Sequence, residues 1–178
     1  MRNFHLLGWG SILLLVSFAC ANGQSHPKRD ALRGIARMKV AIESLGAETQ
    51  AGGLSVEQLQ ADVELRLRKA GLRVLDESGD DLAPFLYVNV HAIKGDIGSF
   101  YAVNVSIEFH GWTTFGSGRD LLVTAVPVWS KETLGLLPTE SFATKTRQLV
   151  TDLSDQFIND FLAANPPEPP PPPRLRPR

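Results

Sequence analysis

Two long runs of alternating apolar and polar residues lie close together in the chain, at 85–94 (FLYVNVHAIK) and 101–111 (YAVNVSIEFHG). Period-two alternation is typical of strands with one buried face, and the short link GDIGS between the runs predicts an antiparallel hairpin. If residues whose numbers sum to 195 face each other, one face is wholly apolar, with the pairs Leu86–Phe109, Val88–Ile107, Val90–Val105 and Ala92–Val103. A slip of one residue would set apolar rows opposite polar ones, so burial of one face selects this register.

Further strands are predicted on both sides of this hairpin in the sequence. The alternation in ARMKVAIESL predicts a first strand over about residues 37–45, and LRVL at 72–75 predicts a short second one. The segment LLVTAVPVWS at 121–130 predicts a last strand. Pro127 cannot donate a ladder hydrogen bond there, so it marks a sheet edge or a bulge.

Two helices accompany these strands. In LSVEQL, Ser55 predicts an N-cap with Gln58 reaching back to it, and Gly71 ends that helix in a left-handed conformation. Apolar residues repeated every four positions predict a long second helix from Thr139 to Asn165. The segments GAETQAGG (46–53) and TTFGSGRD (113–120) are predicted as loops.

The resulting order, β-α-β-β-β-β-α, predicts an α+β fold. We expect a two-layer sandwich in which two helices cover the apolar face of a mainly antiparallel sheet of about four to five strands. The other face of the sheet is left polar. The folded part is expected to be a single domain over residues 34–165, after a linker at 22–33 and before a proline- and arginine-rich disordered tail at 166–178.

The N-terminus predicts export. Residues 1–21 show the charged, apolar and small-residue order of a signal peptide, and the apolar stretch is too short for a membrane-spanning helix. Ala19-Cys20-Ala21 favours ordinary cleavage, which releases a periplasmic or secreted chain. Cleavage before Cys20 is the alternative, and lipid on that cysteine would make the protein a membrane-anchored lipoprotein.

Composition excludes several functions. Eighteen basic and nineteen acidic side chains give a net charge of −1, so no basic field is available to attract nucleic acid. Cys20 is the only cysteine, so disulfides and cysteine-based zinc sites are excluded from the mature chain. No cofactor is expected, and a membrane is a partner only if Cys20 is lipidated.

The residues that could carry chemistry are few. His91, Glu108 and His110 fall on the polar face of the predicted sheet, but the register places the two histidines six residues apart along the strands, beyond the reach of one metal ion. No metal site is therefore predicted. The segment ESGDD at 77–81 gathers acids without the ligand spacing of an EF-hand.

The phrases LRGI, LQADVELRLRKAGLRVL, LYVNV and DQFINDFLAANP resemble those of a group of small exported bacterial proteins of unassigned function. The resemblance spans nearly the whole domain and implies an extracytoplasmic α/β protein without bringing an active site. The predicted topology is also similar to that of small envelope lipoproteins that act as accessory subunits.

Three hypotheses for the function follow. The leading one is a non-enzymatic envelope protein that binds a protein partner or small ligand through the open sheet face or its rim, with Tyr87, Trp112 and Trp129 as contacts. The second is a hydrolase that uses His91 and Glu108. The third is a structural envelope component whose arginine-rich tail contacts anionic surfaces.

Overall fold

The computed structural model describes residues 27–166 except residues 77, 79, 97–98 and 118–119. The predicted signal peptide, Cys20 and residues 167–178 of the tail lie outside the described residues. Within them, the strands are β1 (Arg37–Ile42), β2 (Arg73–Val74), β3 (Phe85–Lys94), β4 (Phe100–Ser117) and β5 (Asp120–Pro138). The helices are α1 (Pro27–Asp30), α2 (Ala47–Ala51), α3 (Val56–Lys69) and α4 (Phe142–Ala164), the last preceded by a 3-10 turn, η1 (Thr139–Ser141).

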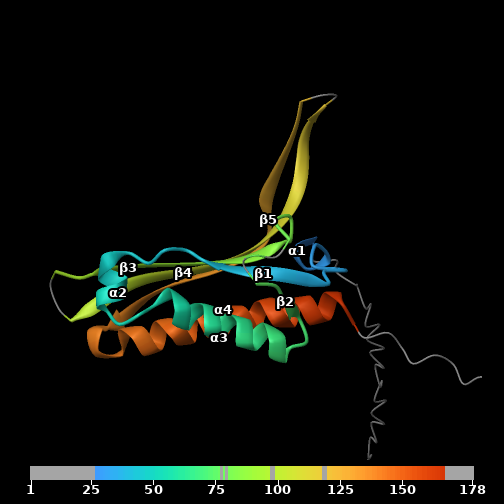
Figure 1. The fold of residues 1–178 in the computed structure, drawn as a ribbon. Coiled ribbons are helices and arrows are strands. Elements are labelled where there is room, and N and C mark those ends of the chain that lie inside the picture. The colour runs from blue at the N-terminus through green and yellow to red at the C-terminus, as the bar shows by residue number, and fades with distance from the viewer. Residues whose placement is uncertain (1–26, 77, 79, 97–98, 118–119, 167–178) are drawn as a thin grey trace, which may run out of the picture.

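The five strands form one sheet in the order β2-β1-β3-β4-β5. β3, β4 and β5 are antiparallel neighbours, whereas β1 runs parallel to both β2 and β3. Helices α3 and α4 lie side by side against one face of the sheet and leave the opposite face open (Figure 1). The predicted α+β two-layer sandwich is confirmed, and the sheet is mixed because α3 carries the chain from β1 to β2 as a parallel crossover.

The hairpin of β3 and β4 has the predicted register. Leu86 faces Phe109, Val88 faces Ile107 and Val90 faces Val105. These side chains are buried beneath α4, where Phe109 packs against Phe157 with ring centroids 5.5 Å apart. The apolar face that selects the register in the sequence is therefore the face that the helices cover.

The local signals for α3 are also confirmed, but the segment before it is not the predicted loop. Ser55 Oγ accepts a hydrogen bond of 3.2 Å from the Gln58 amide, and Gly71 has the positive φ of 87°. Residues 46–53, predicted as a loop, include the short helix α2, which begins after Gly46 and is held by Gln50 Nε2 donating to the Leu45 carbonyl. One and a half turns are too short to show helical periodicity.

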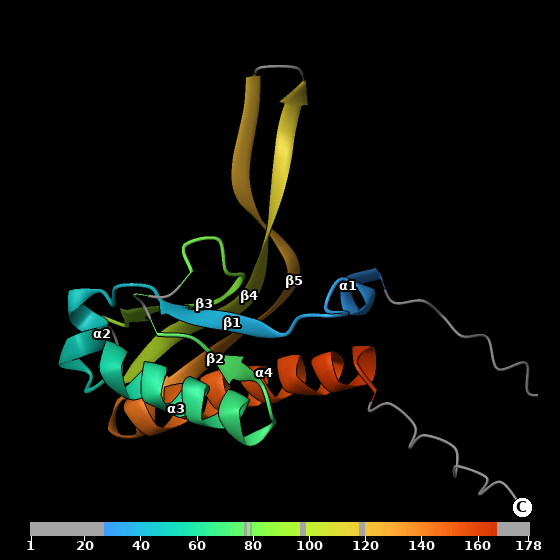
Figure 2. The same ribbon diagram turned by 45° about the vertical axis from the view of Figure 1, so that its right-hand side comes forward.

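The hairpin of β4 and β5 is much longer than the rest of the sheet. The predicted loop at 113–120 is wrong, because β4 continues to Ser117 and β5 begins at Asp120. A bulge at Phe109/His110, with Pro127 opposite His110, lies where the hairpin leaves the body. We call Gly111–Ser117 and Asp120–Pro127 the arm, which projects away from the two layers (Figures 1 and 2).

The folded body begins earlier than the predicted domain boundary at residue 34. Leu32 is fully buried in the core, and Arg29 lies 3.3 Å from Asp160 of α4. Part of the expected linker at 22–33 is therefore folded, and residues 22–26 lie outside the described residues. In the part of the chain that the structure describes, no helix is both long enough and apolar enough to cross a bilayer.

Candidate functional site

A row of four rings crosses the open face of the sheet where the arm begins. Tyr87 contacts His110 edge-on at 5.9 Å between ring centroids, and Phe85 stacks on the other side of His110 at 4.8 Å. Trp112, at the base of the arm, meets Phe85 edge-on at 6.5 Å. We call Tyr87, His110, Phe85 and Trp112 the aromatic row. Its position follows from the alternation of β3 and β4, which directs these side chains away from the helices.

The predicted contacts Tyr87 and Trp112 both belong to this row. Trp112 is 39 % exposed and donates its indole Nε1–H to the Ala83 carbonyl at 3.2 Å. This bond fixes the indole ring while leaving part of it open to solvent. A held, half-exposed tryptophan suits a binding surface, because little side-chain entropy is lost when a ligand packs against it.

Glu43, which follows β1, gathers polar groups beside the row. Its carboxylate accepts a hydrogen bond from Asn89 Nδ2 and interacts with the Tyr87 hydroxyl. Partial burial raises the pKa of Tyr87 above its ordinary value, and the hydrogen bond to Glu43 and the negative charges of Glu43 and Glu108 raise it further. Asn89 Oδ1 is buried and has no hydrogen-bond partner among the described residues.

The three residues considered for chemistry do not come together. His110 Nε2 lies 2.9 Å from Glu108 Oε2, so these two form a pair. His91 is exposed and faces Asn104, six positions along β4 from His110. In the 77–81 segment, Asp80 and Asp81 form ion pairs instead, as in the 2.9 Å contact of Asp80 with Arg37. Among the described residues, no three His, Cys, Asp or Glu side chains form a group that could hold a metal ion.

Trp129 is not a surface contact, contrary to the prediction. It is 1 % exposed, its Nε1–H donates to Asp160 of α4 at 3.0 Å, and its ring meets Phe157 edge-on. The bulge opposite Phe109 and His110 shifts the alternation of β5, so that Trp129 faces the helices. The indole therefore joins sheet and helix inside the core.

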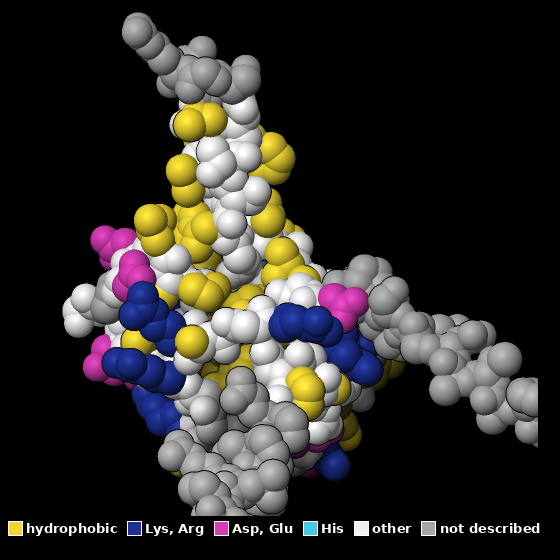
Figure 3. Space-filling view, turned by 90° about the vertical axis from the view of Figure 1, so that its right-hand side faces the viewer, with side chains coloured by type: hydrophobic (Ala, Val, Ile, Leu, Met, Phe, Trp, Pro, Cys, Tyr) yellow, Lys and Arg dark blue, Asp and Glu magenta, His cyan; other side chains and the backbone are white. Residues whose placement is uncertain are grey.

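The arm exposes large apolar side chains that the sequence did not single out. Phe115 is 55 % exposed and Leu122 is 63 % exposed, and Leu121 and Val123 are similarly open. Apolar groups line both sides of the arm in the space-filling view (Figure 3). Leu134 and Leu136 are also exposed on the open face of the body, but Ser130 and Glu132 separate them from the arm. Contiguous apolar surface of this kind marks interaction sites in soluble proteins.

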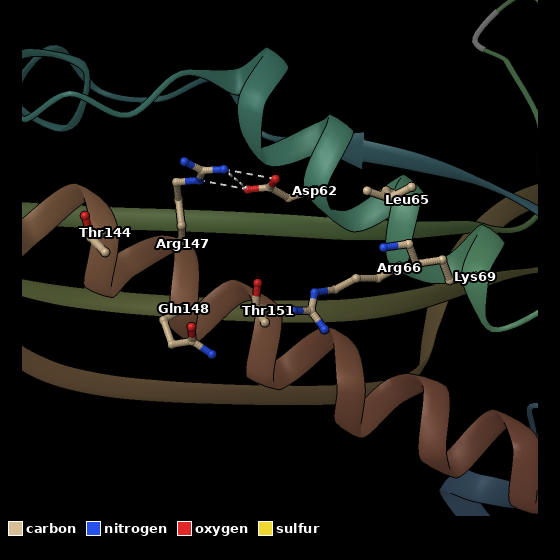
Figure 4. A pocket seen from close by; sticks show the side chains of 8 residues that line it. All are labelled: Asp62, Leu65, Arg66, Lys69, Thr144, Arg147, Gln148 and Thr151. Atoms are coloured by element: carbon tan, nitrogen blue, oxygen red, sulfur yellow. Dashed lines mark hydrogen bonds and ion pairs between the residues drawn. The ribbon is translucent and has the colours of Figure 1, made fainter.

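A hollow of about 430 Å³ lies between α3 and α4 on the outer side of the helix layer (Figure 4). Arg147 spans it and donates to both carboxylate oxygens of Asp62, at 2.8 and 3.0 Å. Arg66, also on its wall, donates to Asp155 at 2.8 and 2.9 Å. Because these guanidinium groups already bind carboxylates across the two helices, the hollow is a helix contact and not an anion site.

Fold and surface together define a class: a two-layer α+β sandwich with an open sheet face, an aromatic row and a projecting apolar arm. No family model and no curated protein sequence matches the chain. Among solved structures, the chain is similar to a minor lipoprotein from Acinetobacter baumannii, with 12% identity over 72% of this chain and 94% of that chain and a TM-score of 0.34. A likeness at this level assigns neither fold nor function.

Proposed function

We propose that this chain is an exported, non-enzymatic binding protein whose partner contacts the aromatic row and the arm. The observation that carries the proposal is the continuity of the two surfaces, which meet at Trp112. An arm that exposes apolar groups on both sides buries almost nothing in the body. Each Å² of this exposed apolar surface that a partner covers would contribute about 25 cal/mol to the binding free energy.

The backbone of the arm indicates which kind of partner it receives. Beyond His110, β4 has no neighbour other than β5 among the described strands, and β5 is the edge of the sheet. Both outer edges of the arm therefore carry backbone N–H and C=O groups without a strand partner. Such groups are costly in hydrocarbon, so a protein that supplies hydrogen bonds is a better partner than the interior of a bilayer.

The hydrolase hypothesis has weaker support. A general base needs a neighbouring group and a cavity where a substrate can sit near it. Glu108 lines a hollow of about 400 Å³ with Ser106 and Ser130, but it pairs with His110 and not with His91, the residue that the hypothesis names. Turnover in a broad hydrolase screen that disappears in Glu108→Ala would establish an enzyme in place of a binding protein.

Site-specific photo-crosslinking tests the binding proposal in the host cell. A photoreactive phenylalanine analogue placed at Phe115 or Trp112 should give one discrete adduct. The control position is Leu65 on α3, which is 53 % exposed, much like the 55 % of Phe115, but lies on the helix layer. The proposal fails if Leu65 gives the same adduct or if neither arm position gives any.

A further inference from the structure

A hollow of about 370 Å³ lies at the free edge of β1, beside the base of the arm. Its apolar wall includes Ile42, Val56, Phe85 and Trp112, and Asp81 stands at its rim. We call it the edge hollow. It shares Phe85 and Trp112 with the aromatic row, so the two surfaces adjoin at these rings.

The backbone of β1 supplies hydrogen-bond donors to the edge hollow. Lys39 donates its amide to Pro84 and Glu43 donates to Val88, so the odd-numbered residues bond to β3. In a parallel ladder the intervening residues, Val40 and Ile42, direct their N–H groups to the opposite edge. β2 pairs only with Arg37 and Met38, so no described strand reaches these two amides.

The rim of the edge hollow holds one acid, Asp81, beside one base, Lys39, and leads to an acidic loop. Asp76, Asp80 and Asp81 belong to the loop between β2 and β3, and the side chain of Asp81 is fully exposed. Asp80 binds Arg37 and Asp81 lies 4.0 Å from Lys39, so the loop already attracts cationic groups. Aromatic walls, free backbone donors and an acidic loop are the features that bind a proline-rich segment bearing arginines. Proline offers carbonyl acceptors without an N–H, packs on aromatic rings, and leaves the charges to pair with acids.

This chain contains such a segment. Residues 167–178 include five consecutive prolines, Pro169–Pro173, followed by Arg174, Arg176 and Arg178. We propose that residues 167–178 bind in the edge hollow, with prolines against Phe85 and Trp112 and arginines toward the acidic loop. The proposal is independent of the partner inferred above, although both surfaces include Trp112.

The end of α4 lies close enough to the edge hollow for residues 167–178 to reach it. Asn165 bonds to the Leu32 carbonyl at 2.9 Å and to the Gly34 amide at 2.7 Å, which fixes the end of α4 beside the start of the folded chain. Lys39, on the wall of the hollow, is five residues beyond Gly34, a span of at most about 17 Å. Twelve residues in polyproline II cover about 37 Å. The end of α4, α1 and the base of the arm also share one end of the sheet (Figure 2).

The two tryptophans allow a direct test by NMR. Ending the chain after Pro166 should shift the indole N–H resonance of Trp112 and the amides of Val40 and Ile42, while the buried Trp129 stays in place. A synthetic peptide of residues 167–178 should restore the original positions in a saturable way. The same peptide with its three arginines changed to glutamine should bind at least about tenfold more weakly at low salt, because the charge pairs are lost.

The proposal is overturned if Trp112, Val40 and Ile42 do not respond to removal of the tail and the peptide binds nowhere near them. If the shortened chain fails to fold, the indole N–H resonance of Trp129 also shifts and shows this. The full-length variant with Arg174, Arg176 and Arg178 changed to glutamine then takes its place, and unchanged Trp112 and Val40 resonances in that variant count against the tail contact. The Phe115 crosslink distinguishes this outcome from failure of the binding proposal. If the Phe115 adduct persists while Trp112, Val40 and Ile42 do not respond, only the tail contact is wrong.

Discussion

At the scale of single residues, the two tryptophans of the sheet show how one bulge separates core from surface. Trp112 lies in β4 and Trp129 in the neighbouring β5, and both follow a run of alternating residues in the sequence. Trp112 lies beside Phe85 on the open face because β4 alternates without interruption, whereas the bulge in β5 turns Trp129 to the helix side, beneath α4. Pro127 predicts a sheet edge or a bulge, and the structure has both there, but the side to which each tryptophan turns depends on how the strands pair.

The difference predicts unequal losses of stability. Trp129→Ala should lower the free energy of unfolding by about 3–5 kcal/mol, because it leaves a cavity against Phe157 and removes the donor to Asp160. Trp112→Ala should cost about 1 kcal/mol, since its ring is half exposed. Urea unfolding of both variants measures this. Equal losses would mean that Trp129 is not the core residue described.

Tyr87 predicts a dependence of stability on alkaline pH. Burial and Glu43 raise its pKa in the folded chain above the ordinary 10.0, so the folded state holds the phenol proton more tightly than the unfolded state does. The resulting stabilisation is complete below the unfolded pKa and is lost as the pH rises through the folded one. Tyr87→Phe should therefore lose less stability than the parent as the pH rises above about 10. Urea unfolding across that range decides it, and parallel losses would contradict the raised pKa.

At the scale of elements, sequence patterns predict those segments that have one buried face. The β3–β4 register, the Ser55 cap and the long stripe of α4 are confirmed because each depends on burial against a single core. The arm has no such face. Residues 113–120 read TTFGSGRD, with two glycines and no alternation of apolar and polar side chains, so the pattern resembles a loop. The aromatic row shows the same limit: Tyr87 and Trp112 could be predicted as surface residues, but their contact with Phe85 and His110 depends on pairing across strands.

The arm should be dispensable for folding. Replacing residues 114–123 with Asn-Gly joins Thr113 to Thr124, which already face each other, through a two-residue turn. Because the removed side chains at 114–116 and 121–123 are exposed and Trp112 is kept, the free energy of unfolding should change by less than about 1 kcal/mol. The crosslink from the Trp112 position should weaken strongly. Urea unfolding together with crosslinking yield tests both halves, and a large loss of stability would show that the arm supports the body.

At the scale of the whole molecule, the layers are joined by the two ends of the described chain. The sequence predicts one domain but places its start two residues after Leu32, because a single buried leucine between Ala31 and Arg33 gives no periodic signal. In the structure Asn165 bonds to the Leu32 carbonyl and Arg29 pairs with Asp160. The segment at 27–33 therefore closes the end of the core beside α4.

Two truncated chains that differ only in residues 27–33 should show how much this segment contributes to stability. A chain of residues 27–166 keeps Leu32 and should unfold cooperatively, whereas a chain of residues 34–166 loses a fully buried leucine and the Arg29–Asp160 pair. We expect the shorter chain to be less stable by about 2–5 kcal/mol, the usual cost of removing a buried leucine side chain. Urea unfolding at matched concentration gives the difference. If both chains are equally stable, the core begins at β1 and residues 27–33 are the linker that the sequence predicts.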